Sequence, residues 1–314
     1  MNTSDFRTFG IIGGDKRQLF LAKSVSDSCY DVILGGFDKL TSDGTLHLTD
    51  IRTAILNSDV VIFPVPSICT DGTVNTPFSD IKTYLDDEMI DALKTKPVFV
   101  AMHNKFFKAY PQLKNAQVYD YVEKEDFAVS NALLTAEGAV EVAMKNFEGT
   151  ISGSRCLVCG YGRIGKILSQ MLRALNADVT VSARNTKDFA YISAFGCKCT
   201  NTEKLRNIKG YDLVFNTIPA LIFDSELLMN TDRNTIIIDL ASLPGGVDFE
   251  AAKKQGIDAV RALSLPGKSA PKSAGEIIKK TVFNILKEVY GGQRQPSALQ
   301  CAVPFAPFHR LLLK

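Results

Sequence analysis

Three glycines spaced as Gly160-x-Gly162-x-x-Gly165 separate a short apolar run, Cys156 to Cys159, from an amphipathic segment. The apolar run predicts a buried strand, and the amphipathic segment predicts a helix. This arrangement is typical of dinucleotide-binding turns, in which the glycines permit a tight turn, close approach of a pyrophosphate and close packing of the helix. We therefore expect a dinucleotide phosphate at the helix N-terminus. The expected contacts are Gly160, Gly162, Arg163, Ile164 and Gly165.

The end of the next expected strand, Asp178 to Ser182, should decide which dinucleotide binds. A domain that selects NAD usually places a carboxylate there, about 20 residues into the unit, to bind the ribose 2′-OH. This chain instead carries Ser182, Arg184 and Asn185. A guanidinium suits a 2′-phosphate because it offers a planar fork of donors, so we predict a preference for NADP(H) over NAD(H). The alternative, that Arg184 is an ordinary solvated charge, stays open.

Further loops should meet the cofactor at the same edge of this domain. Apolar runs at 212–216 and 235–239 predict two more parallel strands. Loops that follow parallel strands lie at one edge of the sheet, where ligands bind. We expect the nicotinamide to contact these loops, through Thr217, Ile218, Pro219, Leu240 and Ala241.

The length and net charge of the chain exclude some classes of protein. The chain has 314 residues, of which 46% are hydrophobic, and this is enough for two domains. Its 36 basic and 34 acidic residues leave a net charge of +2, so no general field favours nucleic acid or an anionic membrane. The first residues lack a signal-peptide pattern, and no apolar run approaches the length of a membrane span. We expect a cytoplasmic protein.

The seven cysteines are odd in number and irregularly spaced, which favours reduced thiols over a disulfide framework. Cys156 and Cys159 have a spacing that also occurs in zinc sites. Side chains three positions apart on a strand point to opposite faces, however, and cannot bind one ion together. We therefore expect core thiols and no metal site.

Short apolar runs alternate with mixed segments along the chain. In its first part, such runs lie at 8–12, 30–34, 59–63 and 97–102. Near-continuous apolar strands indicate parallel sheets that are covered on both faces. We expect an α/β fold with two doubly wound, Rossmann-like parallel sheets and an active cleft between the domains.

The expected domain organisation follows from these runs. A linking segment at 131–149, whose helix Thr135 should cap, should join the domains and act as the hinge that closes the cleft. The expected parts are a substrate domain at 1–130, the linking helix at 131–149, an NADP-binding domain at 150–270, a helix at 271–290 that packs back on the first domain, and a disordered tail at 291–314.

Five motifs are distributed over both expected domains. They are Ile12 to Gln18, Asn131 with Thr135 to Gly138, Asn216 to Pro219, Ile238 to Asp248, and Leu265 to Gly275. Together they closely resemble one family, the A subunits of dipicolinate synthase from spore-forming bacteria. The resemblance runs from about Phe9 to Tyr290, and residues 291–314 fall outside it.

The resemblance implies an activity and a partner. The reaction would be oxidation of a dihydrodipicolinate-type precursor to pyridine-2,6-dicarboxylate with NADP⁺ as the acceptor, during sporulation in the mother cell. The partner would be the B subunit of dipicolinate synthase. The oligomeric state stays open, a homo-oligomer included.

The implied dicarboxylate substrate needs cations or oriented amides to bind its two carboxylates. Arg17 and Lys272 are the expected cations, although both could also be ordinary surface charges. The expected substrate contacts are Gly14, Asp15, Arg17, Thr135, Lys268 and Lys272.

Glu137 is the expected proton acceptor, because a carboxylate in a closing cleft loses hydration and then accepts a proton more readily. The alternative, that Glu137 lies in the first turn of its helix and only complements the macrodipole, stays open. Ser242 and Asn131 are expected to orient the substrate or the nicotinamide amide. Among the histidines, only His103 is expected near the cleft.

Two other functions compete with this interpretation. A D-2-hydroxyacid dehydrogenase shares the two-domain plan, but it needs a late catalytic histidine, and the loop from Leu265 to Lys268 has none. A scaffold that holds NADP for a catalytic partner also stays open. The glycine pattern Gly160-x-Gly162-x-x-Gly165, the dinucleotide-binding fingerprint, indicates binding and not turnover.

Overall fold

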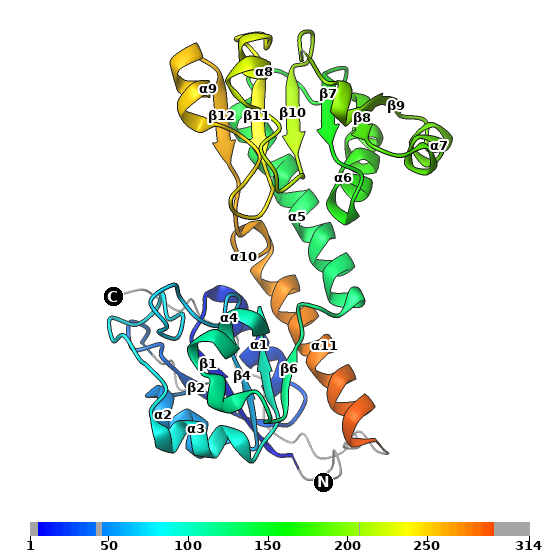
Figure 1. Ribbon diagram of the computed structural model, residues 1–314. Helices are drawn as coiled ribbons and strands as arrows, with labels where there is room; N and C mark the ends of the chain where they lie inside the picture. The colour runs from blue at the N-terminus through cyan, green and yellow to red at the C-terminus, as the bar shows by residue number, and fades with distance from the viewer. Residues whose placement is uncertain (1–5, 42–45, 207, 292–314) are drawn as a thin grey trace. The chain divides into compact units, whose positions relative to one another are not determined.

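The computed structural model describes residues 6–41, 46–206 and 208–291. These residues form two compact units. Unit 1 contains the described residues up to Ala128 and those from Pro271 onward, and unit 2 contains Val129–Ala270. Figure 1 shows a sheet with flanking helices in each unit. The disordered tail expected at 291–314 lies, apart from Gly291, outside the described residues.

Unit 1 has a six-stranded parallel sheet in the order β3-β2-β1-β4-β5-β6. Helices α1, α11 and the start of α5 pack on one face, and α2, α3 and α4 pack on the other. The strands are β1 (Thr8–Ile12), β2 (Asp31–Gly35), β3 (His47–Thr49), β4 (Val60–Ile62), β5 (Val98–Val100) and β6 (Val118–Asp120). The helices are α1 (Lys16–Ser26), α2 (Ile51–Leu56), α3 (Asp87–Lys94), α4 (His103–Ala109), a 3₁₀ turn (Pro111–Leu113) and α11 (Pro271–Tyr290).

Unit 2 repeats this topology with a sheet in the order β12-β11-β10-β7-β8-β9. Helices α5, α6 and α7 cover one face, and α8 and α9 cover the other. The strands are β7 (Arg155–Cys159), β8 (Asp178–Ala183), β9 (Lys198–Asn201), β10 (Leu213–Asn216), β11 (Ile236–Asp239) and β12 (Asp258–Arg261). The helices are α5 (Glu125–Asn146), α6 (Arg163–Ala174), α7 (Thr186–Ala194), a 3₁₀ turn (Thr202–Lys204), α8 (Ser225–Met229), α9 (Phe249–Gln255) and α10 (Leu265–Ser269).

The prediction of two doubly wound parallel sheets is confirmed. Every strand pairing within the two sheets is parallel. Each sheet also has a buried apolar cluster on each face, as near-continuous apolar strands require. Within the described residues, no helix combines the length and hydrophobicity needed to cross a membrane.

The opposite orientations expected for Cys156 and Cys159 are also found. Cys156 belongs to the core on one face of the unit 2 sheet, and Cys159 belongs to the core on the other face. Both are fully buried, and burial raises the pKa of Cys156 to about 11 and that of Cys159 to about 12. A buried, protonated thiol is neither a good nucleophile nor a good metal ligand.

The N-cap predicted for the linking helix is wrong. Helix α5 begins at Glu125, ten residues before Thr135, with Glu125 and Asp126 in its first turn. Thr135 therefore lies inside the helix, where its Oγ1 donates a hydrogen bond to the carbonyl of Asn131 at 2.8 Å. Thr side chains in helix interiors commonly make this bond to the preceding turn.

Candidate functional site

In unit 2, the order of the strands reverses between β7 and β10, which are neighbours although they are far apart in the sequence. Ligands bind at such switch points in doubly wound sheets, beyond the carboxyl ends of the strands. The glycine turn from β7 to α6 lies at this point. Gly160 has a φ of 99°, a conformation that favours glycine, and its N–H donates to the carbonyl of Ser182 at 3.0 Å.

The other two fingerprint glycines meet different constraints. A Cβ at Gly165 would lie 2.1 Å from the carbonyl oxygen of Gly160, so only glycine lets α6 pack this closely on the turn. A Cβ at Gly162 would meet nothing within 4 Å. The absence of a side chain at Gly162 therefore leaves open space at the N-terminus of α6.

The N-terminus of α6 is suited to an anion. Gly162 is its N-cap residue, no side chain caps it, and its first turn contains no acidic residue. The helix dipole and the first-turn amides are then available to a negatively charged group. Arg163 and Ile164 open this turn. The structure thus places the predicted pyrophosphate contacts together at one helix end.

Three side chains at and after the end of β8, those of Ser182, Arg184 and Asn185, were predicted to contact the cofactor. Only one of them is available to a ligand. Ser182 is fully buried, and its Oγ accepts a hydrogen bond from Thr202 at 2.9 Å, so its predicted contact with the cofactor is not supported. Asn185 caps α7 by accepting from the N–H of Asp188 and also donates to that carboxylate. Arg184 is exposed and has no ion pair within the described residues.

A buried polar pair that the sequence analysis did not single out organises the neighbouring loops. Asn216 and Asp239 end β10 and β11, lie directly across from each other, and are joined by a 2.8 Å hydrogen bond from Asn216 Nδ2 to Asp239 Oδ1. Asn216 also bonds both the N–H and the carbonyl of Ile218. Asp239 accepts from the N–H groups of Ala241 and Gly246. The pair therefore fixes the loops that follow both strands.

The predicted nicotinamide contacts differ in accessibility. Thr217 Oγ1 donates to the carbonyl of Cys159 at 2.8 Å, close to the glycine turn. Thr217 and Ile218 are half-buried, whereas Pro219 is exposed. Leu240 and Ala241 are buried, so they support the loop rather than offering side-chain surface to a ligand.

In unit 1, the corresponding switch point lies between β1 and β4. Gly14 follows β1 with a φ of 90°, and its N–H donates to the carbonyl of Asn75 at 2.8 Å. Asp15 is the N-cap of α1. The oriented amide that Gly14 was expected to offer a substrate carboxylate is therefore already used within the unit.

Arg17 is also engaged. Its Nε lies 2.8 Å from Asp15 Oδ1 and its Nη2 lies 2.9 Å from Asp15 Oδ2, while Nη2 also donates to the carbonyl of Val65. The residue is only 7% exposed. The predicted carboxylate-binding fork is thus filled by the carboxylate of Asp15, and a substrate would have to displace it. Next to it, both polar side-chain atoms of the fully buried Gln18 lack a hydrogen-bond partner.

The remaining predicted residues divide between the units. Lys272 is exposed in unit 1, and Glu137, Ser242 and Lys268 are exposed in unit 2. Glu137 lies in the middle of α5, so the alternative that it occupies the first helical turn is wrong. The other two predicted residues, Asn131 and Thr135, are joined by the hydrogen bond inside α5.

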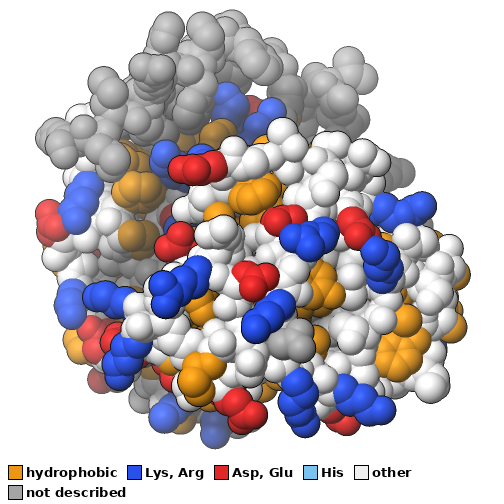
Figure 2. All heavy atoms as spheres, turned by 90° about the horizontal axis from the view of Figure 1, so that it is seen from above, with side chains coloured by type: hydrophobic (Ala, Val, Ile, Leu, Met, Phe, Trp, Pro, Cys, Tyr) orange, Lys and Arg blue, Asp and Glu red, His pale blue; other side chains and the backbone are white. Residues whose placement is uncertain are grey.

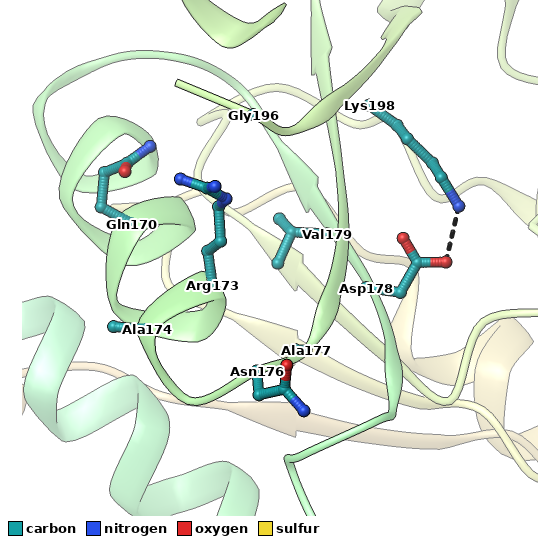
Figure 3. A pocket seen from close by; sticks show the side chains of 9 residues that line it. All are labelled: Gln170, Arg173, Ala174, Asn176, Ala177, Asp178, Val179, Gly196 and Lys198. Carbon is teal, nitrogen blue, oxygen red and sulfur yellow. Dashed lines mark hydrogen bonds and ion pairs between the residues drawn. The ribbon is translucent and has the colours of Figure 1, made fainter. Parts of the chain in front are cut away.

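The pocket in Figure 3 lies elsewhere in unit 2, near the amino end of β8. Its volume is about 520 Å³, and its lining includes Gln170, Arg173 and Lys198. Lys198 is paired with Asp178, the first residue of β8, at 2.6 Å. Because the fingerprint glycines are at the carboxyl edge of the sheet, this pocket is not part of the candidate nucleotide site.

Comparison with known proteins assigns the family. Residues 8–122 match the family model of the N-terminal domain of the dipicolinate synthase A subunit. Over 283 residues, the chain is 33% identical to the A subunit of dipicolinate synthase from Bacillus subtilis (strain 168), an alignment that covers 89% of this chain and 95% of that protein. The chain belongs to the family of dipicolinate synthase A subunits. The resemblance inferred from the sequence motifs is confirmed.

Solved structures of this family agree with the fold. The crystal structure of the dipicolinate synthase A subunit from Bacillus halodurans matches with a TM-score of 0.77 and 32% identity, over 89% of this chain and 97% of that one. The corresponding Bacillus subtilis structure gives the same TM-score and identity, over 90% and 96%. A Sinorhizobium meliloti transhydrogenase shares the fold at a TM-score of 0.63 and 15% identity, over 88% and 92%.

An added methyl group would clash at Gly165 but not at Gly162, so substitutions at these two glycines should separate an effect on stability from an effect on binding. Gly165→Ala should destabilise unit 2 by about 1–3 kcal/mol, because the added methyl group overlaps the Gly160 carbonyl. Gly162→Ala should lower the unfolding midpoint in urea much less and should weaken NADPH binding, because its methyl group enters the open space at the α6 N-terminus, where we expect the pyrophosphate. Unchanged NADPH affinity in a folded Gly162→Ala protein would place the pyrophosphate elsewhere.

The exposed guanidinium of Arg184 predicts a preference for NADPH over NADH. Arg184→Glu should lower the affinity for NADPH relative to NADH by about tenfold to a hundredfold, because a charge-assisted contact with the 2′-phosphate is replaced by repulsion. Fluorescence titrations with both nucleotides measure the ratio. Arg233→Glu makes the same change in charge at an exposed position before β11, at the opposite edge of the sheet, and should leave the ratio unaltered. A ratio that Arg184→Glu does not change means that Arg184 does not read the 2′-phosphate.

Proposed function

We propose that this chain oxidises a dihydrodipicolinate-type precursor to pyridine-2,6-dicarboxylate and transfers the hydride to NADP⁺. The observation that carries the proposal is the fingerprint turn at the β7/β10 switch point, with open space at Gly162 and an uncapped α6 N-terminus. Membership of the family of dipicolinate synthase A subunits supplies the substrate class.

The preference for NADP⁺ rests on the residues that follow β8. No carboxylate occupies Ser182 to Asn185, where a domain specific for NAD would bind the ribose 2′-OH. The exposed Arg184 is free to pair with a 2′-phosphate, since it has no ion pair among the described residues.

The proposed reaction does not require a covalent bond between the substrate and the protein. A hydride leaves a ring carbon of the substrate, a proton is lost nearby, and aromatisation of the ring provides the driving force. A bound nicotinamide would supply the hydride acceptor, so the chain's own residues have to orient the substrate and remove the proton.

We assign these tasks to the exposed residues of the family motifs. Lys268 and Lys272 have no ion pairs within the described residues and can neutralise substrate carboxylates. Glu137 is exposed on α5 and can accept the proton, and Ser242 can orient the substrate or the nicotinamide amide. Arg17 acts only if the substrate displaces Asp15 from it.

A partner belongs to the proposal as well. The Bacillus subtilis relative is named as one lettered subunit of dipicolinate synthase, which implies a second subunit for that protein. We propose that the B subunit of the same enzyme assembles with this chain. On the face shown in Figure 2, Lys and Arg side chains are scattered among Asp and Glu, with uncharged surface between them, which does not favour a highly charged partner there.

Binding of both ligands tests the proposed function directly. NADPH should bind more tightly than NADH, and pyridine-2,6-dicarboxylate should increase the affinity for NADPH, because the reaction needs both ligands in one complex. Fluorescence titration of NADPH, with and without the dicarboxylate, measures this coupling. NADPH binding that the dicarboxylate leaves unaltered would keep the cofactor and contradict the substrate.

Substitution of Glu137 tests the proton acceptor. Glu137→Gln should lower kcat by about a hundredfold or more, with little change in NADPH affinity, since general base catalysis contributes about that much. Formation of NADPH by the chain, with and without the B subunit, provides the assay. Glu148→Gln, an equivalent change at an exposed residue after α5, should retain full activity. Full activity in Glu137→Gln would show that Glu137 is not the base.

A further inference from the structure

Three side chains from two adjacent strand ends of unit 1 converge at a place that the proposed reaction does not use. His103 begins α4 just after β5, and Asp120 is the last residue of β6. These strands are paired in register, with Val100 across from Asp120. Glu123 follows three residues later. His103 Nδ1 lies 3.1 Å from Asp120 Oδ2 and 3.2 Å from Glu123 Oε1.

The charges in this cluster are not balanced by the groups around it. The Nδ1 of His103 can carry only one hydrogen, yet it faces two carboxylates. Within the described residues, no Lys or Arg forms an ion pair with Asp120 or Glu123, and the neighbouring Lys124 is paired with Glu288. Apart from the imidazole itself, no cation among the described residues pairs with these two carboxylates to offset their repulsion.

Asp120, the most buried member of the cluster, is held in place by hydrogen bonds within the protein. The Asp120 side chain is only 5% exposed. Its Oδ2 accepts from the backbone N–H of His103 at 2.7 Å, and its Oδ1 accepts from that of Val122 at 3.0 Å. Glu123, by contrast, is 63% exposed, so an ion can reach the cluster from solvent. A fixed buried ligand beside an open one is suitable for metal binding, because little ordering remains to be done.

We propose that His103, Asp120 and Glu123 bind a divalent transition metal such as Zn²⁺. The three ligand atoms lie within 4.8 Å of one another. In a tetrahedral site with bonds of about 2.0–2.1 Å, neighbouring ligand atoms are about 3.3 Å apart, close to the two distances from Nδ1.

The ligand set also indicates which metals would be preferred. Imidazole favours Zn²⁺ and its transition-metal neighbours over Ca²⁺ and Mg²⁺, which prefer oxygen ligands. Three protein ligands leave at least one coordination position for water or an anion. This inference does not depend on the proposed oxidation, and its test needs no turnover.

Calorimetric titration of the whole chain with Zn²⁺ alone tests the site. One Zn²⁺ should bind per chain, and both His103→Ala and Glu123→Gln should weaken this binding by about tenfold or more, since even residues that only support a metal ligand often contribute this much. His47→Ala removes another exposed histidine, in β3, and should retain the parent affinity. The same comparison with Mg²⁺ should show much weaker binding.

Each outcome of the titration is informative. Absence of Zn²⁺ binding, or parent-like affinity in either folded variant, would overturn the proposal. An equal loss of affinity in His47→Ala would mean general surface binding and would overturn it too. Circular dichroism identifies any variant that fails to fold. If His103→Ala is one, Glu123→Gln decides the question, because its exposed side chain is not required for packing.

Discussion

All strand pairings in the two sheets are parallel, and this constraint determines where polar chemistry can occur in each unit. Parallel strands need a crossover that lies on a face of the sheet, so both faces become buried and apolar. Polar groups are then concentrated at the strand ends. Both candidate switch points, β1/β4 in unit 1 and β7/β10 in unit 2, lie at carboxyl ends for this reason.

The sequence predicted well those features that depend on local backbone geometry. Gly165 is required by a contact with Gly160, five residues earlier in the chain, and a spacing pattern captures such a contact directly. The two sheets were predictable for a similar reason, because each strand is a short apolar run in the sequence. The start of α5 was not predicted correctly. Thr135 has a side chain that is common at N-caps, but the same residue type also occurs inside helices, as it does here.

Side-chain roles were less predictable because they depend on partners distant in the sequence. Ser182 bonds Thr202, 20 residues later, and is buried rather than available to a ligand, and Arg17 bonds a carbonyl 48 residues away. The cluster of His103 with Asp120 also requires that β5 and β6 be neighbours. From the sequence, only cysteines were considered as metal ligands, and they were rejected because side chains three apart on a strand point to opposite faces, as those of Cys156 and Cys159 do.

The pair of Asn216 and Asp239 shows how one strand register decides the conformation of the loops at the carboxyl edge of the unit 2 sheet. Each residue alone is an ordinary polar group at the end of an apolar strand, and only the pairing of β10 with β11 places them opposite each other. Loss of the Asp239 carboxylate would leave the Asn216 amide and the N–H groups of Ala241 and Gly246 without their acceptor. Each buried group left unsatisfied costs about 1–3 kcal/mol. The loops that follow the two strands therefore keep their conformation because a single buried carboxylate serves both of them.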